Sequence, residues 1–338
     1  MLARRRWAVR APHPQSLDPR HGRLARRRAR PRRQPVGRDH PAAVRAYQPV
    51  GEPGPQPTDR HLLPATPRLL RDPRLGDQRS RVPRPGAVVT TSFHELLISL
   101  DRTAFGTWVK LPTVDVVELL AHAGFDFLVI DMEHSPLDVL TVHQLLGTAR
   151  GCGLPTLVRV PDRTPSTISR VLDSGSAGVL VPHVDTVADA RAVVSAGRFT
   201  PHGTRGYGPT VRAGVWGADV PSYRASGEEI AVIPQLESRE AIEAVREIGA
   251  VHGLAALFVG PADLAVATGL DAGSPEFTAL LDDVASAAEE LRLPLGTAVA
   301  SAAAARELPR QHDFVLIAND ASLLGQAART VVAEARGR

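Results

Sequence analysis

The chain has 338 residues, of which 43% are hydrophobic and 22% charged, as expected for one large or two ordinary globular domains. Its single cysteine, Cys152, excludes an internal disulfide, a four-cysteine zinc site and a c-type haem attachment. No apolar run approaches the roughly 18 residues of a membrane-spanning helix. No apolar stretch of the kind found in a secretory signal follows the basic start. We therefore expect a cytoplasmic protein with no membrane partner.

Charge and proline divide the chain into two regions. Residues 1–87 hold 21 basic and 6 acidic side chains, a net charge of +15, whereas residues 88–338 hold 19 basic and 30 acidic ones, a net charge of −11. Of the 29 prolines, 15 precede residue 88. The sequence therefore predicts a basic arm over residues 1–92 and an acidic folded domain over residues 93–338.

No helical or strand periodicity persists in the arm, which cannot bury enough apolar surface to offset its ordering entropy, so we expect it to be disordered. It could bind the phosphates of nucleic acid, direct the chain to an organelle, or have no function and not belong to the native protein. The last hypothesis is favoured, because every lysine or arginine position in the arm is Arg. A GC-rich reading frame produces that bias without selection, so we do not expect a nucleic-acid partner.

Eight apolar runs follow, without the alternation of a half-exposed sheet, and they predict strands buried on both faces. The runs cover residues 105–110, 125–133, 154–160, 177–183, 230–237, 254–261, 293–299 and 313–320. Helical patterns such as residues 113–122 and 238–248 lie between them. Eight strand–helix units in about 245 residues predict a (β/α)₈ barrel. A doubly wound sheet is the alternative, but its glycine-rich phosphate turn is missing.

One predicted connection is unusually long. It spans residues 186–229 and contains the glycine-rich segment RFTPHGTRGYGPTVRAGVWG. Long ordered loops in compact domains are usually functional, so the sequence predicts a lid.

Polar residues stand where four of the predicted strands end. Catalytic residues of a barrel project from those carboxyl ends. The residues are Asp131 and His134 after the second strand, Arg159 after the third, Gln235 and Glu237 on the fifth, and Gly260, Pro261, Ala262 and Asp263 after the sixth.

Two of these residues, Glu237 and Asp263, can share a magnesium ion whose remaining positions are filled by water and substrate oxygens. The alternative is that Glu237 pairs with an arginine and Asp263 caps a helix. His134 can act as a general base or metal ligand with Asp131 fixing its tautomer, or it can be a structural histidine.

The planar guanidinium of Arg159 can donate hydrogen bonds to a carboxylate or an enolate oxygen, or it can form a structural ion pair. The turn at residues 260–263 presents backbone N–H groups to a carboxylate, or only connects a strand to a helix. Asp173, at a helix end, is expected on the surface, and His183 is a weaker site candidate than His134.

Six motifs together resemble the HpcH/HpaI aldolase family. They are DMEH (131–134), the strand end at Arg159, VLDSGSAGVLVPHVDT (171–186), RFTPHGTRG (198–206), QLES (235–238) and GPADL (260–264). The resemblance runs from about residue 94 to 336 and excludes the arm. It implies a (β/α)₈ barrel that acts as a metal-dependent pyruvate aldolase on 4-hydroxy-2-oxo acids, assembled as a homo-hexamer.

The resemblance also implies roles for these residues. Glu237 and Asp263 would hold Mg²⁺ or Mn²⁺, with Co²⁺ as a further candidate, and Arg159 would stabilise the enolate oxygen. His134, oriented by Asp131, would handle the proton of the aldol hydroxyl. The substrate carboxylate would be held by Gln235, Gly260, Pro261 and Ala262. Asp173 would lie close to a neighbouring subunit's site.

The sequence departs from the family pattern at Ala265, where a serine is usual, and at Ala318-Asn319-Asp320, where a glycine-x-aspartate is usual. These departures leave the aldehyde partner open. A related lyase acting on a CoA thioester, or an oxaloacetate decarboxylase, is the alternative activity. No imine-forming lysine is implied, and the chain's one lysine is Lys110.

Overall fold

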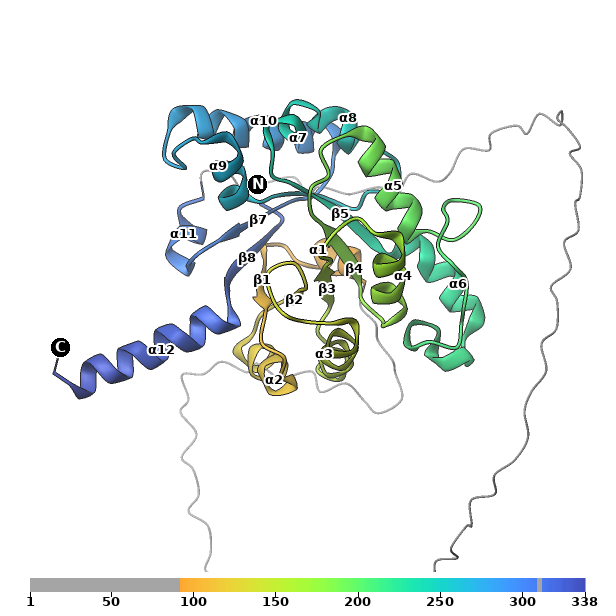
Figure 1. Ribbon diagram of the computed structural model, residues 1–338, viewed down its shortest axis with the longest axis horizontal. Coiled ribbons are helices and arrows are strands. Elements are labelled where there is room, and N and C mark those ends of the chain that lie inside the picture. The colour runs from red at the N-terminus through yellow and green to blue at the C-terminus, as the bar shows by residue number, and fades with distance from the viewer. Residues whose placement is uncertain (1–91, 309–311, 338) are drawn as a thin grey trace, which may run out of the picture. The chain divides into compact units, whose positions relative to one another are not determined.

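Eight parallel strands close into a barrel in the computed structural model, which describes residues 92–308 and 312–337 (Figure 1). Each strand pairs with the next one in the chain, and β8 pairs with β1. The strands are β1 (Ala104–Val109), β2 (Phe127–Asp131), β3 (Thr156–Arg159), β4 (Gly178–Val181), β5 (Ala231–Leu236), β6 (Leu257–Val259), β7 (Leu295–Val299) and β8 (Phe314–Asn319). The predicted (β/α)₈ barrel is confirmed, and all eight predicted strands are present.

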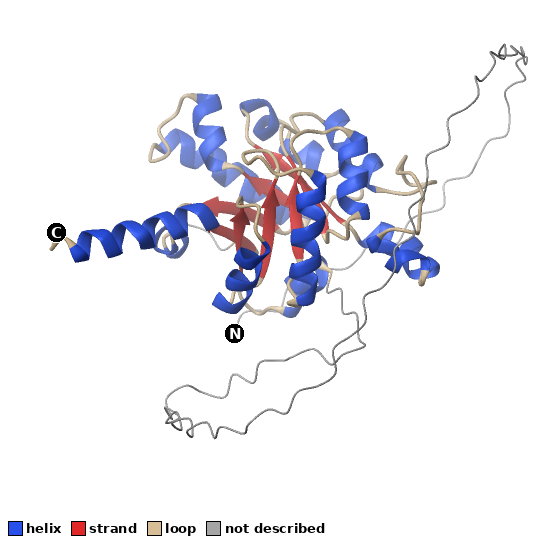
Figure 2. Cartoon of the chain, turned by 60° about the horizontal axis from the view of Figure 1, so that its bottom comes forward, coloured by secondary structure: helices blue, strands red, loops and turns tan. Residues whose placement is uncertain are grey.

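Helices surround the strands (Figure 2). They are α1 (Phe93–Ser99), α2 (Val114–Ala123), α3 (Val139–Gly151), α4 (Pro165–Asp173), α5 (Val187–Gly197), the 3₁₀ helix η1 (Arg212–Gly217), α6 (Val220–Glu229), α7 (Arg239–Glu243), α8 (Val245–Gly249), α9 (Pro261–Thr268), α10 (Pro275–Leu291), α11 (Ala302–Arg306) and α12 (Asp320–Ala335). The single helix predicted over residues 238–248 is two short helices that meet at Ala244. No helix among the described residues is long and apolar enough to cross a membrane.

Aromatic rings fill the barrel near the amino ends of the strands. Phe93 of α1 packs edge-on against Phe127 and Phe314, with ring centroids 5.2 Å away in both cases. Gly106 makes room for these rings, because a methyl group there would lie 2.5 Å from the Phe127 ring. This plug closes one end of the barrel, so the polar residues of the interior are gathered towards the other.

The prediction of a lid over residues 186–229 is wrong in two respects. Helices α5 and α6 occupy both ends of the segment, and only residues 198–219, with η1, are irregular. In a parallel barrel α5 returns the chain from the carboxyl end of β4 to the amino end of β5. The segment after α5 therefore lies at the amino end of the barrel, away from the residues that it was expected to cover.

The predicted basic arm, residues 1–92, lies outside the described residues except for Ser92. The Ser92 hydroxyl accepts a hydrogen bond from the amide of Glu95 and so caps α1. The boundary between arm and barrel stays a prediction.

A bulge interrupts the pairing of β8 with β1. Gly106 pairs with Leu316 and Trp108 with Asn319, so two residues of β8 oppose one residue of β1. One of the two, Ala318, has a φ of 56°, in the left-handed region that favours glycine. This is the position at which the sequence departs from the family's glycine.

We expect Ala318→Gly to stabilise the fold by roughly 1 kcal/mol, because glycine adopts this conformation without the steric cost of a Cβ atom. Thermal unfolding should then shift upward by about 2–4 °C. Ala298→Gly in β7, where φ is negative, is the matched control and should lower the transition. An unchanged or lower transition in Ala318→Gly would show that the bulge carries no strain.

Candidate active site

An ion pair joins the carboxyl ends of β2 and β3. Asp131 and Arg159 are neighbours in the parallel register and end their strands. Arg159 Nε donates to Asp131 Oδ1 at 2.9 Å, and Nη2 donates to Oδ2 at 2.8 Å. The guanidinium also stacks 4.1 Å from the ring centroid of Trp108. Both side chains are buried, so the pair is a fixed feature of the barrel mouth.

Asp131 also accepts from the backbone N–H groups of Glu133 and His134, at 3.1 and 3.2 Å. Lys110 Nζ lies 3.1 Å from its Oδ2. Burial by itself would raise the pKa of the Asp131 carboxyl, but the hydrogen bonds and charge of Arg159, with the charge of Lys110, hold it below its usual value. The contact between these two residues is made by the His134 amide, and both carboxylate oxygens accept from other donors, so the expected orientation of the His134 imidazole by Asp131 stays a prediction.

A second group of side chains lies at the ends of β2, β4 and β5. Glu133, His183 and Glu237 each place one donor atom within 4.8 Å of the others. His183 Nδ1 is 2.9 Å from Glu237 Oε1, and the His183 amide donates to the same oxygen at 2.8 Å. Glu133 Oε1 is 3.7 Å from His183 Nε2. Burial, with the nearby negative charge of Glu237, raises the pKa of Glu133 despite the opposing charge of Arg159.

The oxygens of this group fit a divalent cation. Glu133 Oε2 and Gln235 Oε1 are buried and accept no hydrogen bond from any residue between 92 and 337 that the structure describes. Arg159 Nη1 lies 3.1 Å from Glu133 Oε2, but without hydrogen-bond alignment. Buried acceptors without donors are costly unless a cation or water meets them. Carboxylate oxygens and an amide oxygen suit Mg²⁺ or Mn²⁺.

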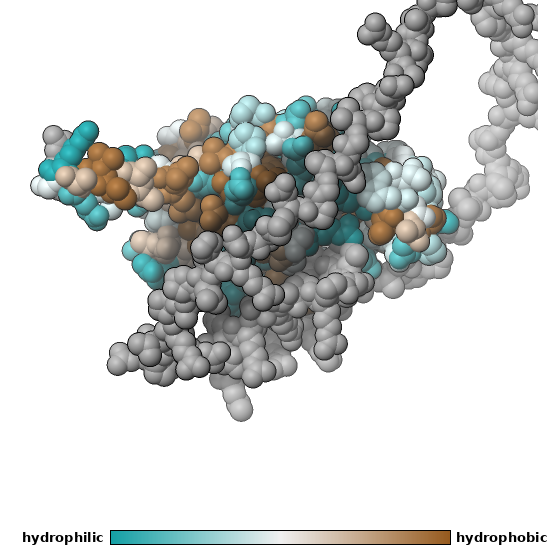
Figure 3. Space-filling model, turned by 90° about the horizontal axis from the view of Figure 1, so that it is seen from below, coloured by the Kyte–Doolittle hydropathy of each residue, from teal (hydrophilic) through white to brown (hydrophobic). Residues whose placement is uncertain are grey.

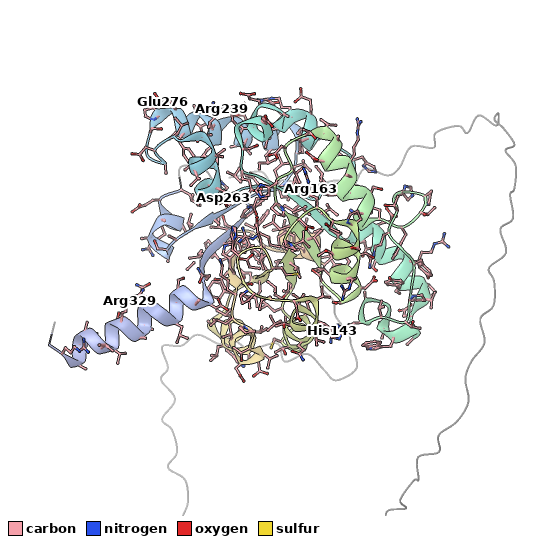
Figure 4. All side chains as sticks on the ribbon, in the orientation of Figure 1. His143, Arg163, Arg239, Asp263, Glu276 and Arg329 are labelled. Carbon is pink, nitrogen blue, oxygen red and sulfur yellow. The ribbon has the colours of Figure 1, made fainter. Side chains whose placement is uncertain are left out.

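The turn after β6 lies against this group. A methyl group at Gly260 would sit 3.2 Å from Gln235 Nε2 and 3.5 Å from Glu237 Oε2. Pro261 and Ala262 begin α9, and Asp263, labelled in Figure 4, is half-buried in its first turn. Asp263 therefore belongs to the same rim, but it is not a member of the three-residue group, and the predicted pair of Glu237 and Asp263 stays a prediction.

The two histidines of the rim differ in their contacts. The His134 imidazole is half-exposed, and its Nε2 is 3.9 Å from Glu133 Oε2. His183, the weaker candidate from sequence, touches Glu237 directly and has a φ of 53°. Arg163, also labelled in Figure 4, donates to the His183 carbonyl at 2.7 Å. In the sequence, His183 was recognisable as a site candidate only because it follows a buried strand.

Asp173 lies at the other end of the barrel. It is the last residue of α4, which runs back from β3 to the start of β4. Its Oδ1 accepts from Arg205 Nη2 at 2.6 Å and from the Tyr223 hydroxyl at 3.0 Å. Burial, with the charge of Asp173, raises the pKa of Tyr223 to about 12. The structure thus does not bring Asp173 to the predicted site of its own chain.

A cavity of about 350 Å³ opens beside this cluster. Its walls include Arg205 and Tyr223, together with residues that precede β3, β4 and β5 such as Pro155, Ala177 and Ile230. Catalytic groups of barrels stand at the carboxyl ends of strands. We therefore place the candidate active site at the opposite rim, where the buried ion pair and the three-residue group lie.

Comparison with known proteins finds similar proteins over most of the described chain. The family model described as HpcH/HpaI aldolase/citrate lyase matches residues 104–323, a span that contains every one of these rim residues. A pyruvate aldolase of Rhizobium etli is 36% identical over 236 residues, which are 69% of this chain and 92% of that protein. A hydroxypyruvate/pyruvate aldolase of Chromohalobacter salexigens is 37% identical over 240 residues, 70% and 94% of the two chains. The crystal structure of an HpcH/HpaI aldolase/citrate lyase family protein from Burkholderia cenocepacia has a TM-score of 0.68 and 34% identity, covering 72% of this chain and 98% of its own.

Removal of the Asp173 charge should destabilise the fold, because the Arg205 side chain is fully buried and Asp173 is its partner in an ion pair. We expect Asp173→Asn to lower the free energy of unfolding by about 3 kcal/mol, measured by denaturant titration. A double variant with Arg205→Met should recover part of the loss, because no buried charge is then left unpaired. Equal stability of Asp173→Asn and the parent would contradict this account.

Proposed function

This chain belongs to the HpcH/HpaI aldolase/citrate lyase family and is a carbon–carbon lyase of the aldolase type, and we propose that it cleaves a 4-hydroxy-2-oxo acid into pyruvate and an aldehyde and joins them in reverse. The observation that carries this proposal is the contact of a buried guanidinium, Arg159, with the carboxylate of Glu133, which lies beside Glu237 at the barrel mouth. Such a site combines fixed positive charge with oxygen ligands, which suits a reaction that develops charge on a keto oxygen.

The family is metal-dependent, and we propose that Glu237 and Asp263 hold Mg²⁺, Mn²⁺ or Co²⁺ in this chain. One ligand atom each of Glu133, His183 and Glu237 lies within 4.8 Å of the others, so Glu133 and His183 can contact a cation bound to Glu237. The cation would supply Lewis-acid charge to the carboxylate and keto oxygens of the 2-oxo acid. The proposal is supported by the buried oxygens of Glu133 and Gln235 that accept no hydrogen bond from the described part of the chain.

The chain's own residues would bind and orient the substrate. Gln235 lies buried beside Gly260, where the missing side chain lets the substrate carboxylate approach the backbone. The first-turn amides of Ala262 and Asp263, after Pro261, have no acceptor inside α9 and would donate to that carboxylate. Arg159, fixed by Asp131, would meet the oxygen that gains charge when the bond between carbons 3 and 4 breaks.

His134 would take the proton of the hydroxyl on carbon 4. Bond cleavage leaves the electron pair on carbon 3 and converts the hydroxyl carbon to the aldehyde, so a base must accept that proton. The imidazole is half-exposed at the mouth, where an aldehyde can enter and leave, and Glu133 lies 3.9 Å from it. In the reverse reaction the same imidazole would return the proton.

Exchange of the methyl protons of pyruvate for deuterium tests this function, because it reports enolate formation without any knowledge of the aldehyde. With Mg²⁺ or Mn²⁺ we expect exchange, followed by proton NMR, and its loss on adding EDTA. Glu237→Gln should lower the rate by about 100-fold. Exchange that survives both EDTA and Glu237→Gln would overturn the metal assignment. Its absence in the folded parent protein with every metal would overturn the pyruvate proposal.

The same assay separates the role of His134. His134→Ala should retain most of the metal-dependent exchange, yet lose condensation of pyruvate with any aldehyde that the parent protein accepts. Equal loss of both activities would assign the imidazole to enolate formation instead.

We also propose that the chain forms a homo-oligomer, for which the family resemblance implies a hexamer. Helix α12 projects from the barrel instead of packing over β8 and β1 (Figure 1). Every described residue of α12 after Asp320 is at least partly exposed, and the apolar side chains Leu324 and Val331 are each 64% exposed. Figure 3 shows the resulting hydrophobic surface along the helix. Exposed apolar patches of this kind are typical of protein interfaces.

Leu324→Glu should therefore shift the protein to smaller species in sedimentation velocity, since it places a charge on the apolar face of α12. Gln326→Glu, an exposed position on the polar face of the same helix, is the matched control and should leave the assembly unchanged. A parent protein that sediments as a monomer would contradict the proposal.

A further inference from the structure

The chain's one lysine stands at the candidate site. Lys110 directly follows β1, two residues after Trp108, and alternate residues of a strand share a face. Its Nζ lies 3.1 Å from Asp131 Oδ2, the oxygen to which Arg159 Nη2 also donates. Its side chain is 26% exposed, so most of the aliphatic stem is covered. Lys110 and Arg159 thus approach one buried carboxylate together.

Hydrogen bonds also fix the backbone at Lys110. The amides of Lys110 and Leu111 donate to the carboxylate of Asp320 at 2.9–3.0 Å. Asp320 is buried and is the first residue of α12. A buried carboxylate from the far end of the sequence therefore fixes the point from which the lysine reaches the site.

The choice of lysine has a chemical reason. Arg159 already occupies both oxygens of Asp131 with two parallel hydrogen bonds. A second planar guanidinium would have to compete for the same edge, whereas a compact ammonium can share one oxygen. The other 39 residues of the Lys and Arg type in this chain are all Arg. Lys110 is the exception, and it stands where a compact ammonium can share the carboxylate with Arg159.

We infer that Lys110 is a positioning residue: it fixes Asp131 and, through Asp131, the guanidinium of Arg159 over Trp108, and it forms no covalent bond with substrate. Two cations balance the Asp131 charge, so Arg159 can direct its third nitrogen, Nη1, towards Glu133 and the reacting oxygen. The kinetic consequence rests on the proposed function. The geometric consequence does not, because it concerns the protein without substrate.

Trp108 reports the position of Arg159. In a Trp7→Phe, Trp216→Phe background Trp108 is the remaining tryptophan of the chain. Arg159→Met defines the emission of Trp108 without the cation above its ring. We expect Lys110→Met to move the emission spectrum towards that reference. An unchanged spectrum would overturn the inference, whatever happens to activity.

Chemical rescue tests the charge itself. In a Cys152→Ser background, Lys110→Cys should lower the turnover number of pyruvate exchange by about 10- to 100-fold, with a smaller change in KM. Aminoethylation of the new thiol rebuilds an ammonium of nearly the same length and should restore both exchange and Trp108 emission. Carbamidomethylation, which adds a neutral group, should restore neither.

Three results would overturn the inference. The first is exchange that is lost in Lys110→Met while Trp108 emission stays unchanged, which would place Lys110 against substrate directly. The second is rescue by the neutral group as well as by the ammonium. The third is inactivation of the parent protein by borohydride and pyruvate with a mass increase on Lys110, which would show an imine. If the parent protein gives no exchange at all, the proposed function fails and Trp108 emission alone decides the role of Lys110.

Discussion

The carboxylate of Asp131 is the constraint on which the candidate site depends. It is fully buried, accepts hydrogen bonds from the guanidinium of Arg159 and two backbone amides of its own loop, and forms an ion pair with the ammonium of Lys110. An isolated charge at this depth would be expensive to desolvate, so the donors and cations around it offset the cost of its burial. Because the same donors and cations belong to the rim, the pairing that stabilises this buried charge also fixes the geometry of the site.

Barrel closure decides which residues meet at this carboxylate. Asp131 and Arg159 face each other because β2 and β3 are in parallel register at their last residues. Gln235 and Glu237 meet Gly260 because β5 and β6 are neighbours at the same level. The aromatic plug of Phe93, which α1 provides, closes the opposite end. The polar side chains of the barrel interior therefore lie together at the rim formed by the carboxyl ends of the strands.

The sequence predicted the parts of the molecule that depend on local pattern. Each strand was visible as an apolar run, and Arg159 and Glu237 were visible as polar residues at strand ends. Contacts that depend on the closed barrel were not predictable in this way. His183 gained its place beside Glu237 from a left-handed backbone conformation, and Asp131 contacts the His134 amide instead of its ring. The direction of the segment after α5 depended on which end of the barrel its helix reaches, and a loop's composition does not encode this.

A long-range contact also joins the first strand of the barrel to its last helix. Asp320 begins α12, and its carboxylate holds the amides at the carboxyl end of β1 from which Lys110 reaches Asp131. Asn319, just before it, caps the helix and closes the bulge that contains Ala318. A surface helix with an unpaired apolar face is therefore anchored by the residue that also fixes the rim of the site. The carboxylate of Asp320 thus joins the helix on which the proposed assembly depends to the strand end from which Lys110 reaches Asp131.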